Sequence, residues 1–297
     1  MTLAKTADSV QVLRAALWMT GSIASFSAMA VAGRQVSVEL DTFEVMMYRS
    51  FVGVLVVLAV GLYAGTLGQV TRSNFGLQIT RNIAHFAGQN LWFYAVTVIP
   101  LAQVFALEFT SPLWVLVLSP LLLGERLTPT RAIAAMMGFV GILIVARPGS
   151  TEISPGVIAA ASCAICFAVT IMLTKRLTRT ATITCILVYL TVTQAVFGMV
   201  CAGFDGDVAL PSATILPWVI LIGLAGLLAH YCLTNALAIA PATVVVPIDF
   251  SRLPVISIVA YLIYGESVHY TVFIGAAIIF VGNYFNILTE TRRVQPA

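Results

Sequence analysis

The chain has 297 residues, of which 60% are hydrophobic and only 9% are charged, and its formal net charge is +3. A soluble domain carries about 25% charged residues, so this composition excludes a soluble globular protein and indicates one that is surrounded by lipid. In such a chain the small positive charge is a signal of membrane topology, and it does not indicate a nucleic-acid partner.

Ten apolar stretches are each long enough, at roughly 20 residues, to cross a bilayer. We therefore expect an all-α integral membrane protein in which Pro100 and Pro241 mark short breaks, because proline ends helices. The expected membrane helices cover residues 12–32, 42–64, 75–97, 101–123, 130–147, 153–174, 181–203, 214–238, 242–264 and 270–289.

The two halves of the chain are related by a constant offset, so a repeat is predicted before any single residue is interpreted. The offset is 141 positions, as from Glu108 to Asp249, and it holds without a gap. It also pairs Ile99-Pro100 with Ala240-Pro241, Gly124-Glu125 with Gly265-Glu266, Phe26 with Phe167, Arg34 with Lys175, and Gly141 with Gly282. We expect two repeats of five helices each, covering residues 1–149 and 150–297.

The distribution of lysine and arginine predicts the orientation. With a cytoplasmic N-terminus, eleven of these residues fall on the cytoplasmic side, two fall on the other side, and Arg49 and Arg252 fall within helices. We therefore expect both termini in the cytoplasm and the protein in the inner (cytoplasmic) membrane. Because five is odd, the second repeat begins on the opposite face. The prediction is an inverted-topology repeat around a central cavity, which suits alternating access.

Polar residues inside membrane helices are costly, so each one is a functional candidate. Arg81, His85, Gln89 and Trp92 share one face of the third helix. We expect His85, Gln89 and Trp92 to line a cavity, with a polar packing strip as the alternative. We expect Arg81 to extend its charged end to the cytoplasm.

Two acidic residues, Glu108 and Asp249, are expected at mid-depth in the fourth and ninth helices. Arg252 follows Asp249 at i+3, and the two can neutralise each other within one helix. Alternatively one of them faces the cavity, where a carboxylate suits an ammonium group and a guanidinium suits a carboxylate. We expect Arg49 to be structural and to be neutralised by Glu39 or Glu44.

Further polar groups lie on the eighth helix, where His230 corresponds to Gln89 in the repeat and Asn235 follows five residues later. A lone membrane histidine is more often a packing residue than a proton carrier, so both interpretations stay open. Prolines interrupt the fourth and ninth helices, which favours these helices as cavity walls or gates. The expected hinge residues are Pro112, Pro247 and Pro254.

The expected helices, the repeat, the Gly-Glu pairs that close helices four and nine, and the segment from Gly141 to Arg147-Pro148-Gly149 resemble the drug/metabolite transporter superfamily of EamA type. The resemblance covers nearly the whole chain, although the second repeat lacks an Arg-Pro-Gly counterpart. It implies a basket of helices around a cavity lined by helices 1, 3, 4, 6, 8 and 9. In general similarity the chain is most like the aromatic amino acid exporter branch. Glu125 and Glu266 are not expected to bind substrate.

The leading hypothesis is a secondary transporter that exports aromatic and other neutral amino acids, or related small metabolites, by alternating access. The alternatives are a transporter of another metabolite or drug, such as a compound like S-adenosylmethionine or a nucleotide, an intramembrane enzyme, and a passive channel or structural protein. No metal-ligand spacing, phosphate loop or catalytic triad is found, so no enzymatic activity and no cofactor are expected. The expected partners are a small-molecule substrate and the bilayer, with a monomer or homodimer as the assembly. Coupling to protons and uniport are both compatible with the sequence.

Overall fold

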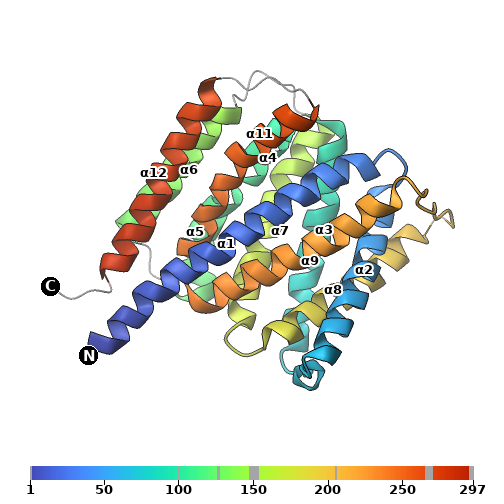
Figure 1. Ribbon diagram of the computed structural model, residues 1–297, viewed down its shortest axis with the longest axis horizontal. Coiled ribbons are helices and arrows are strands. Elements are labelled where there is room, and N and C mark those ends of the chain that lie inside the picture. The colour runs from blue at the N-terminus through green and yellow to red at the C-terminus, as the bar shows by residue number, and fades with distance from the viewer. Residues whose placement is uncertain are drawn as a thin grey trace.

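The computed structural model describes residues 2–99, 101–125, 128–146, 154–204, 206–264 and 270–293, and every regular element within them is a helix (Figure 1). Pro100 and the motifs Arg147-Pro148-Gly149 and Gly265-Glu266 lie outside the described residues. In chain order the elements are α1 (Thr2–Val36), α2 (Thr42–Tyr63), η1 (Leu67–Gln69), α3 (Phe75–Val98), α4 (Leu101–Glu108), α5 (Ser111–Leu123), α6 (Pro129–Ala146), α7 (Pro155–Leu177), α8 (Ile183–Ala202), α9 (Leu216–Ile239), α10 (Ala242–Ile248), η2 (Asp249–Ser251), α11 (Arg252–Tyr264) and α12 (Tyr270–Arg293).

Six stretches of described helix are long and apolar enough to cross a membrane, and each matches one of the ten expected spans. They are Val10–Val36, Thr42–Tyr63, Pro155–Leu177, Ile183–Ala202, Leu216–Ile239 and Ala242–Ile263. Large apolar side chains such as Leu55, Leu121 and Leu262 point outward with at least 70% of their surface exposed, as lipid-facing residues do. The other four expected spans stay predictions.

The helix at 101–123 and the helix at 242–264 are each divided near the middle. Pro112, in the first turn of α5, has no N–H group for the carbonyl of Glu108, and α4 ends at that residue. Pro254 likewise has no N–H group for the carbonyl of Phe250, which lies in the 3-10 turn η2. Both breaks place an acidic residue, Glu108 or Asp249, where regular α-helix stops.

Four helix pairs make the most extensive contacts: α1 with α9, α3 with α7, α2 with α8, and α6 with α12. The last pair lies side by side at one edge of the molecule (Figure 1). Glycine permits this close approach, because a Cβ atom added at Gly141 would come within 2.8 Å of the Gly275 carbonyl oxygen and 2.7 Å of Ile279 Cγ1. Gly282, which corresponds to Gly141 in the repeat, faces Met137 across the same interface.

Polar contacts tie the connecting segments together at the two ends of α2. At its start, Glu39 accepts hydrogen bonds from the Ser212 amide (3.1 Å) and hydroxyl (2.9 Å), and Glu44 accepts one from the Ala209 amide (2.5 Å). Beyond its end, Asn74 Nδ2 donates to Thr180 Oγ1 at 2.9 Å. The loop that precedes α2 thus contacts the loop after α8, and the loop that follows α2 contacts the one before α8.

The joint between α9 and α10 is held from both sides by charged residues. Lys175 Nζ, at the end of α7, donates to the carbonyl oxygens of Leu237 (2.5 Å) and Ala240 (2.7 Å). The carboxylate of Glu125, just beyond α5, accepts from the amides of Ala242 (3.0 Å) and Thr243 (3.3 Å) and from the Thr243 hydroxyl (2.9 Å). Glu125 therefore caps the first turn of α10 from a different helix.

Candidate substrate cavity

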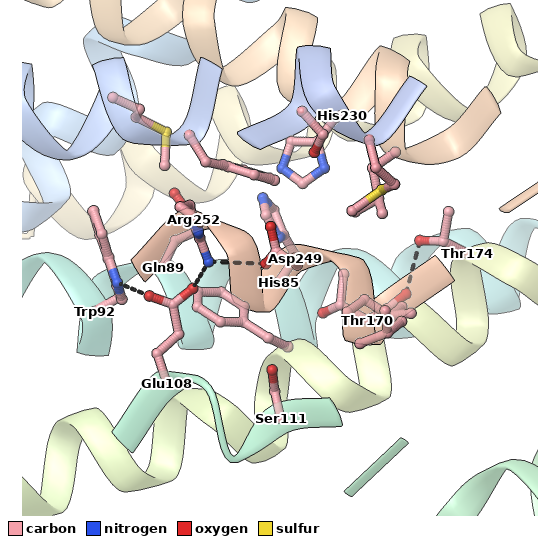
Figure 2. A pocket seen from close by; sticks show the side chains of 18 of the residues that line it. His85, Gln89, Trp92, Glu108, Ser111, Thr170, Thr174, His230, Asp249 and Arg252 are labelled. Atoms are coloured by element: carbon pink, nitrogen blue, oxygen red, sulfur yellow. Dashed lines mark hydrogen bonds and ion pairs between the residues drawn. The ribbon is translucent and has the colours of Figure 1, made fainter. Parts of the chain in front are cut away.

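A cavity of about 60 Å³ lies at the centre of the bundle, between the two divided helices and α1, α3, α7 and α9 (Figure 2). These elements are the ones that the family resemblance implied. The volume has room for a few water molecules, so a metabolite does not fit until the surrounding helices move apart. The cavity is lined by Met19, Ser22, Phe26, Met29, Arg81, His85, Gln89, Trp92, Glu108, Ser111, Phe167, Thr170, Ile171, Thr174, His230, Leu233, Val246, Asp249 and Arg252.

Two carboxylates share one guanidinium at one end of this cavity (Figure 2). Arg252 Nη2 donates to Asp249 Oδ2 at 3.0 Å and forms a very short ion pair with Glu108 Oε1. Trp92 Nε1 donates to the other oxygen of Glu108 at 2.6 Å. The Arg252 guanidinium also lies 4.9 Å from the centre of the Phe109 ring, where a cation–π contact forms. Asp249 Oδ1 is buried and has no hydrogen-bond partner among the described residues.

The sequence predicted only part of this acidic cluster. The Asp249–Arg252 pair follows from its i+3 spacing, but Glu108 is 144 positions from Arg252, and no local pattern brings them together. The helix breaks provide the geometry, because they place both carboxylates where the helix dipole has its negative end. That location is unfavourable for an acid, and Arg252 offsets the cost for both.

Two histidines meet at the middle of the cavity. The ring centres of His85 and His230 are 4.5 Å apart, with the ring planes at 87°. Both side chains are buried, and none of their four ring nitrogens has a hydrogen-bond partner within the described part of the chain. Buried polar atoms are normally paired, so these nitrogens are available to a ligand or to water.

Arg81 lies inside the bundle, and the expectation that it extends to the cytoplasm is wrong. Only 1% of its surface is exposed, and it lines the cavity. Its Nε donates to Thr174 Oγ1 at 3.0 Å and its Nη1 to Asn82 Oδ1 at 2.8 Å. These neutral oxygens accept hydrogen bonds from the guanidinium within the protein, so Arg81 does not need to reach water for its hydrogen bonds. No described carboxylate pairs with it.

Arg49 is also buried, and its expected neutralisation by Glu39 or Glu44 is wrong. Its Nη1 donates to Gln89 Oε1 through a very short hydrogen bond, while the two glutamates bind the segment at 209–212. Gly226 makes room for the guanidinium, because a Cβ atom there would lie 2.9 Å from Arg49 Nη2. Arg49 does not line the cavity, but its hydrogen bond holds Gln89, which does line it.

The remaining sequence candidates divide into two groups. His85, Gln89, Trp92, Glu108, His230, Asp249 and Arg252 all line the cavity, and their role in substrate binding stays a prediction. Asn235 is not among the residues that line the cavity. Its Nδ2 donates to the Tyr231 carbonyl 2.8 Å away on the same helix. Pro112, Pro247 and Pro254 lie in the divided helices, as expected, and their role as hinges stays a prediction.

Sequence reasoning missed the hydroxyl groups of the cavity wall, all of them buried, which belong to Ser22, Ser111, Thr170 and Thr174. The two threonines lie on α7. Their i, i+4 spacing was the available signal. Among the described residues, no group of three His, Cys, Asp or Glu side chains could hold a metal ion.

An all-helical bundle with an apolar exterior and a central cavity that has charged and polar side chains in its wall defines the protein as a multi-pass membrane protein. The model of the EamA-like transporter family matches residues 13–147 and 154–288, so the chain belongs to this family. The protein is therefore a membrane transporter of small molecules and not an enzyme.

Several relatives have named substrates. An S-adenosylmethionine uptake transporter of Rickettsia felis is 26% identical over 278 residues, which cover 94% of each chain. A riboflavin transporter of Brucella anthropi is 33% identical over 211 residues, covering 70% of this chain and 74% of its own. These names give no support to the expected aromatic amino acid exporter branch. One crystal structure, at 20% identity, matches 95% of this chain with a TM-score of 0.79, which shows a shared fold.

Proposed function

We propose that this protein is a secondary transporter that carries a small organic metabolite with an ammonium or sulfonium group across the membrane by alternating access. S-Adenosylmethionine, which has both groups, is the first candidate substrate. The observation that carries this proposal is the acidic cluster in the central cavity, where Glu108 and Asp249 share the single charge of Arg252.

The charge balance of this cluster favours a cationic ligand. Two carboxylates and one guanidinium leave one negative charge in a buried site, and an uncompensated buried charge is costly. Asp249 Oδ1 has a free acceptor position for an ammonium group. The rings of Phe26, Trp92 and Phe167 provide aromatic faces for a cation or for a planar heterocycle.

Neutral and aromatic amino acids, which the sequence analysis predicted to be exported, are the second candidates. They have the same ammonium group, and an aromatic side chain would use the same rings. The S-adenosylmethionine uptake transporters align over nearly the full length of this chain, which favours the first candidate. Riboflavin carries no positive charge, so the acidic cluster does not favour it.

We also propose the ten-helix architecture, with repeats at 1–149 and 150–297 in inverted topology. The packing supports it, because an exchange of the two halves converts the α1–α9 pair into the α7–α3 pair. The same exchange leaves the α2–α8 and α6–α12 pairs unchanged. The start of α1 and the end of α12 lie at the same end of the bundle (Figure 1), which agrees with two cytoplasmic termini in the inner membrane. Opening would bend the helices divided near Pro112, Pro247 and Pro254.

The proposal is tested with purified protein in liposomes and labelled S-adenosylmethionine. We expect saturable uptake and exchange, competed by unlabelled substrate and less by phenylalanine, tryptophan or riboflavin. Asp249→Asn should weaken apparent affinity at least about tenfold, which corresponds to about 1.4 kcal/mol. Asn235→Ala, outside the cavity, should transport as the wild type does. The absence of saturable flux for S-adenosylmethionine and for every amino acid tested would overturn the proposal.

A further inference from the structure

Thr174, which accepts a hydrogen bond from Arg81, lies at the opposite end of the cavity from Glu108 (Figure 2), and this end has the reverse charge. Arg81 lies there, 1% exposed, with no carboxylate partner among the described residues. The oxygens that accept from it, Thr174 Oγ1 and Asn82 Oδ1, are both uncharged. The hydrogen bonds to these two oxygens come from Arg81 Nε and Nη1.

Two histidines of the cavity wall, His85 and His230, lie near this guanidinium. His85 is one helical turn from Arg81 on α3, and His230 reaches the same place from α9, with its ring centre 4.5 Å from that of His85. All four of their ring nitrogens are buried without a partner among the described residues. A ring nitrogen that carries a hydrogen can donate to an anion. The two imidazoles can therefore bind an anion together with the Arg81 guanidinium.

A buried positive charge without a counter-charge is unfavourable unless a ligand supplies one. A guanidinium is well suited to a carboxylate, because its N–H groups form charge-assisted hydrogen bonds in a fixed planar geometry. At the other end of the cavity, Asp249 and Glu108 outnumber Arg252 by one charge. The cavity is therefore dipolar, and a zwitterion matches it better than a simple cation does.

We propose that Arg81, together with His85 and His230, binds the carboxylate of the transported substrate. The substrate then spans the cavity, with its carboxylate at Arg81 and its ammonium group at Asp249 in the acidic cluster. This inference rests on the proposed function and narrows its substrate class to compounds that contain an α-amino acid unit. It also assigns a binding role to Arg81, which the sequence analysis expected to extend its charged end to the cytoplasm.

The test compares substrates that differ only in the carboxylate. S-Adenosylmethionine and decarboxylated S-adenosylmethionine form one pair, and phenylalanine and phenethylamine form the other. Each is measured as a competitor of labelled S-adenosylmethionine binding to the detergent-purified protein. For the wild type we expect the carboxylated member to bind at least about tenfold more tightly, since hydrogen bonds to charged groups are strong.

Three variants separate this role from a structural one. Arg81→Gln should bring the preference close to one while the decarboxylated compounds still bind, and Arg81→Lys should keep part of it. Arg49→Gln removes a second buried arginine that contacts Gln89 without lining the cavity itself, and it should lower the preference much less than Arg81→Gln does. Should Arg81→Gln fail to fold, Thr174→Val, which removes the acceptor of Arg81 Nε, should lower the preference in its place.

Failure of the Arg81 subsite gives a different result from failure of the proposed transport function. If the wild type binds both members of each pair equally, the Arg81 subsite is wrong while cation transport stands. The subsite is also wrong if Arg49→Gln abolishes the preference as fully as Arg81→Gln does. If the wild type binds none of the four compounds, the proposed function itself fails.

Discussion

Arg252 is the residue on which the charge balance of the cavity depends. It is 4% exposed, it pairs with two carboxylates, and its guanidinium lies within 5.6 Å of three aromatic ring centres. Removing either carboxylate leaves one acid and one base, which still neutralise each other. Removing Arg252 leaves the buried Glu108 and the partly buried Asp249 with no described basic partner.

The two kinds of substitution should therefore differ in stability. Arg252→Gln should destabilise the protein by about 3–5 kcal/mol, the usual cost of breaking a buried ion pair. Asp249→Asn should change stability by less than about 1.5 kcal/mol, because Glu108 keeps Arg252 neutralised. Thermal unfolding of the purified variants in one detergent measures both. Equal losses for the two variants would show that Arg252 does not hold this cluster together.

At this scale the sequence predicted the residue types of the site better than their partners. Seven of the expected binding residues share the cavity, because a polar side chain in an apolar helix has few places to go other than the interior. The partners of Glu108, Arg49 and Arg81 could not be predicted. Each comes from an element distant in the chain, or is a neutral oxygen that charge matching does not reveal.

Among the elements, the joint between α9 and α10 has the best-defined attachments. Pro241 precedes α10 and offers no capping side chain, so the amides of Ala242 and Thr243 bind Glu125 from the end of α5. The sequence analysis did not assign substrate binding to Glu125, and its observed contacts are those of a helix cap. Opening the bundle on this side would separate α5 from α10 and break these hydrogen bonds.

Removal of the cap should favour that opening. Loss of an N-cap costs about 0.5–2 kcal/mol, so Glu125→Ala should raise the open fraction by roughly two- to thirtyfold. The measurement is the labelling rate of a cysteine introduced at the cavity residue Leu233, in a protein without its five native cysteines. The thiol reagent is supplied from the side of Glu125.

The matched control for this experiment lies at the start of α2. Glu39 accepts hydrogen bonds from Ser212, and Glu39→Ala removes a similar pair of contacts far from the α9–α10 joint. It should not raise labelling from the side of Glu125. Faster labelling in both variants would mean that the cap is not specific to this joint.

For the whole molecule, the α6–α12 pair is a wall that does not contribute to the cavity. Gly141→Ala should separate these helices and cost about 1–3 kcal/mol, because the new methyl group would meet the Gly275 carbonyl oxygen. Gly76→Ala places the same methyl group where no atom lies within 4 Å, and it should be neutral or stabilising by up to about 1 kcal/mol. Thermal unfolding checks both, and equal effects would contradict the packing argument.

The overall fold was largely predictable, because lipid imposes long apolar helices and the repeat gives their order. The helix at 75–97 is the instructive exception. It forms as expected, as α3, but it is not among the helices apolar enough to cross a membrane. Its buried Gln78, Arg81, Asn82, His85 and Gln89 lower its hydropathy. The polar residues that place α3 in the cavity wall are therefore the ones that make it hard to recognise as a membrane helix.

The short helix α10 has a consequence for how faithfully the protein can transport. It has seven residues, so it is about 10 Å long, and it is too short to bend much. Its first amides bind Glu125, and its C-cap is Asp249 in the cavity. Asp249, where substrate is proposed to bind, and the amides that Glu125 caps thus lie at the two ends of the same short helix. If the proposed binding at Asp249 is correct, substrate binding and the Glu125 contact are coupled through α10, and we expect this coupling to reduce transport in the absence of substrate.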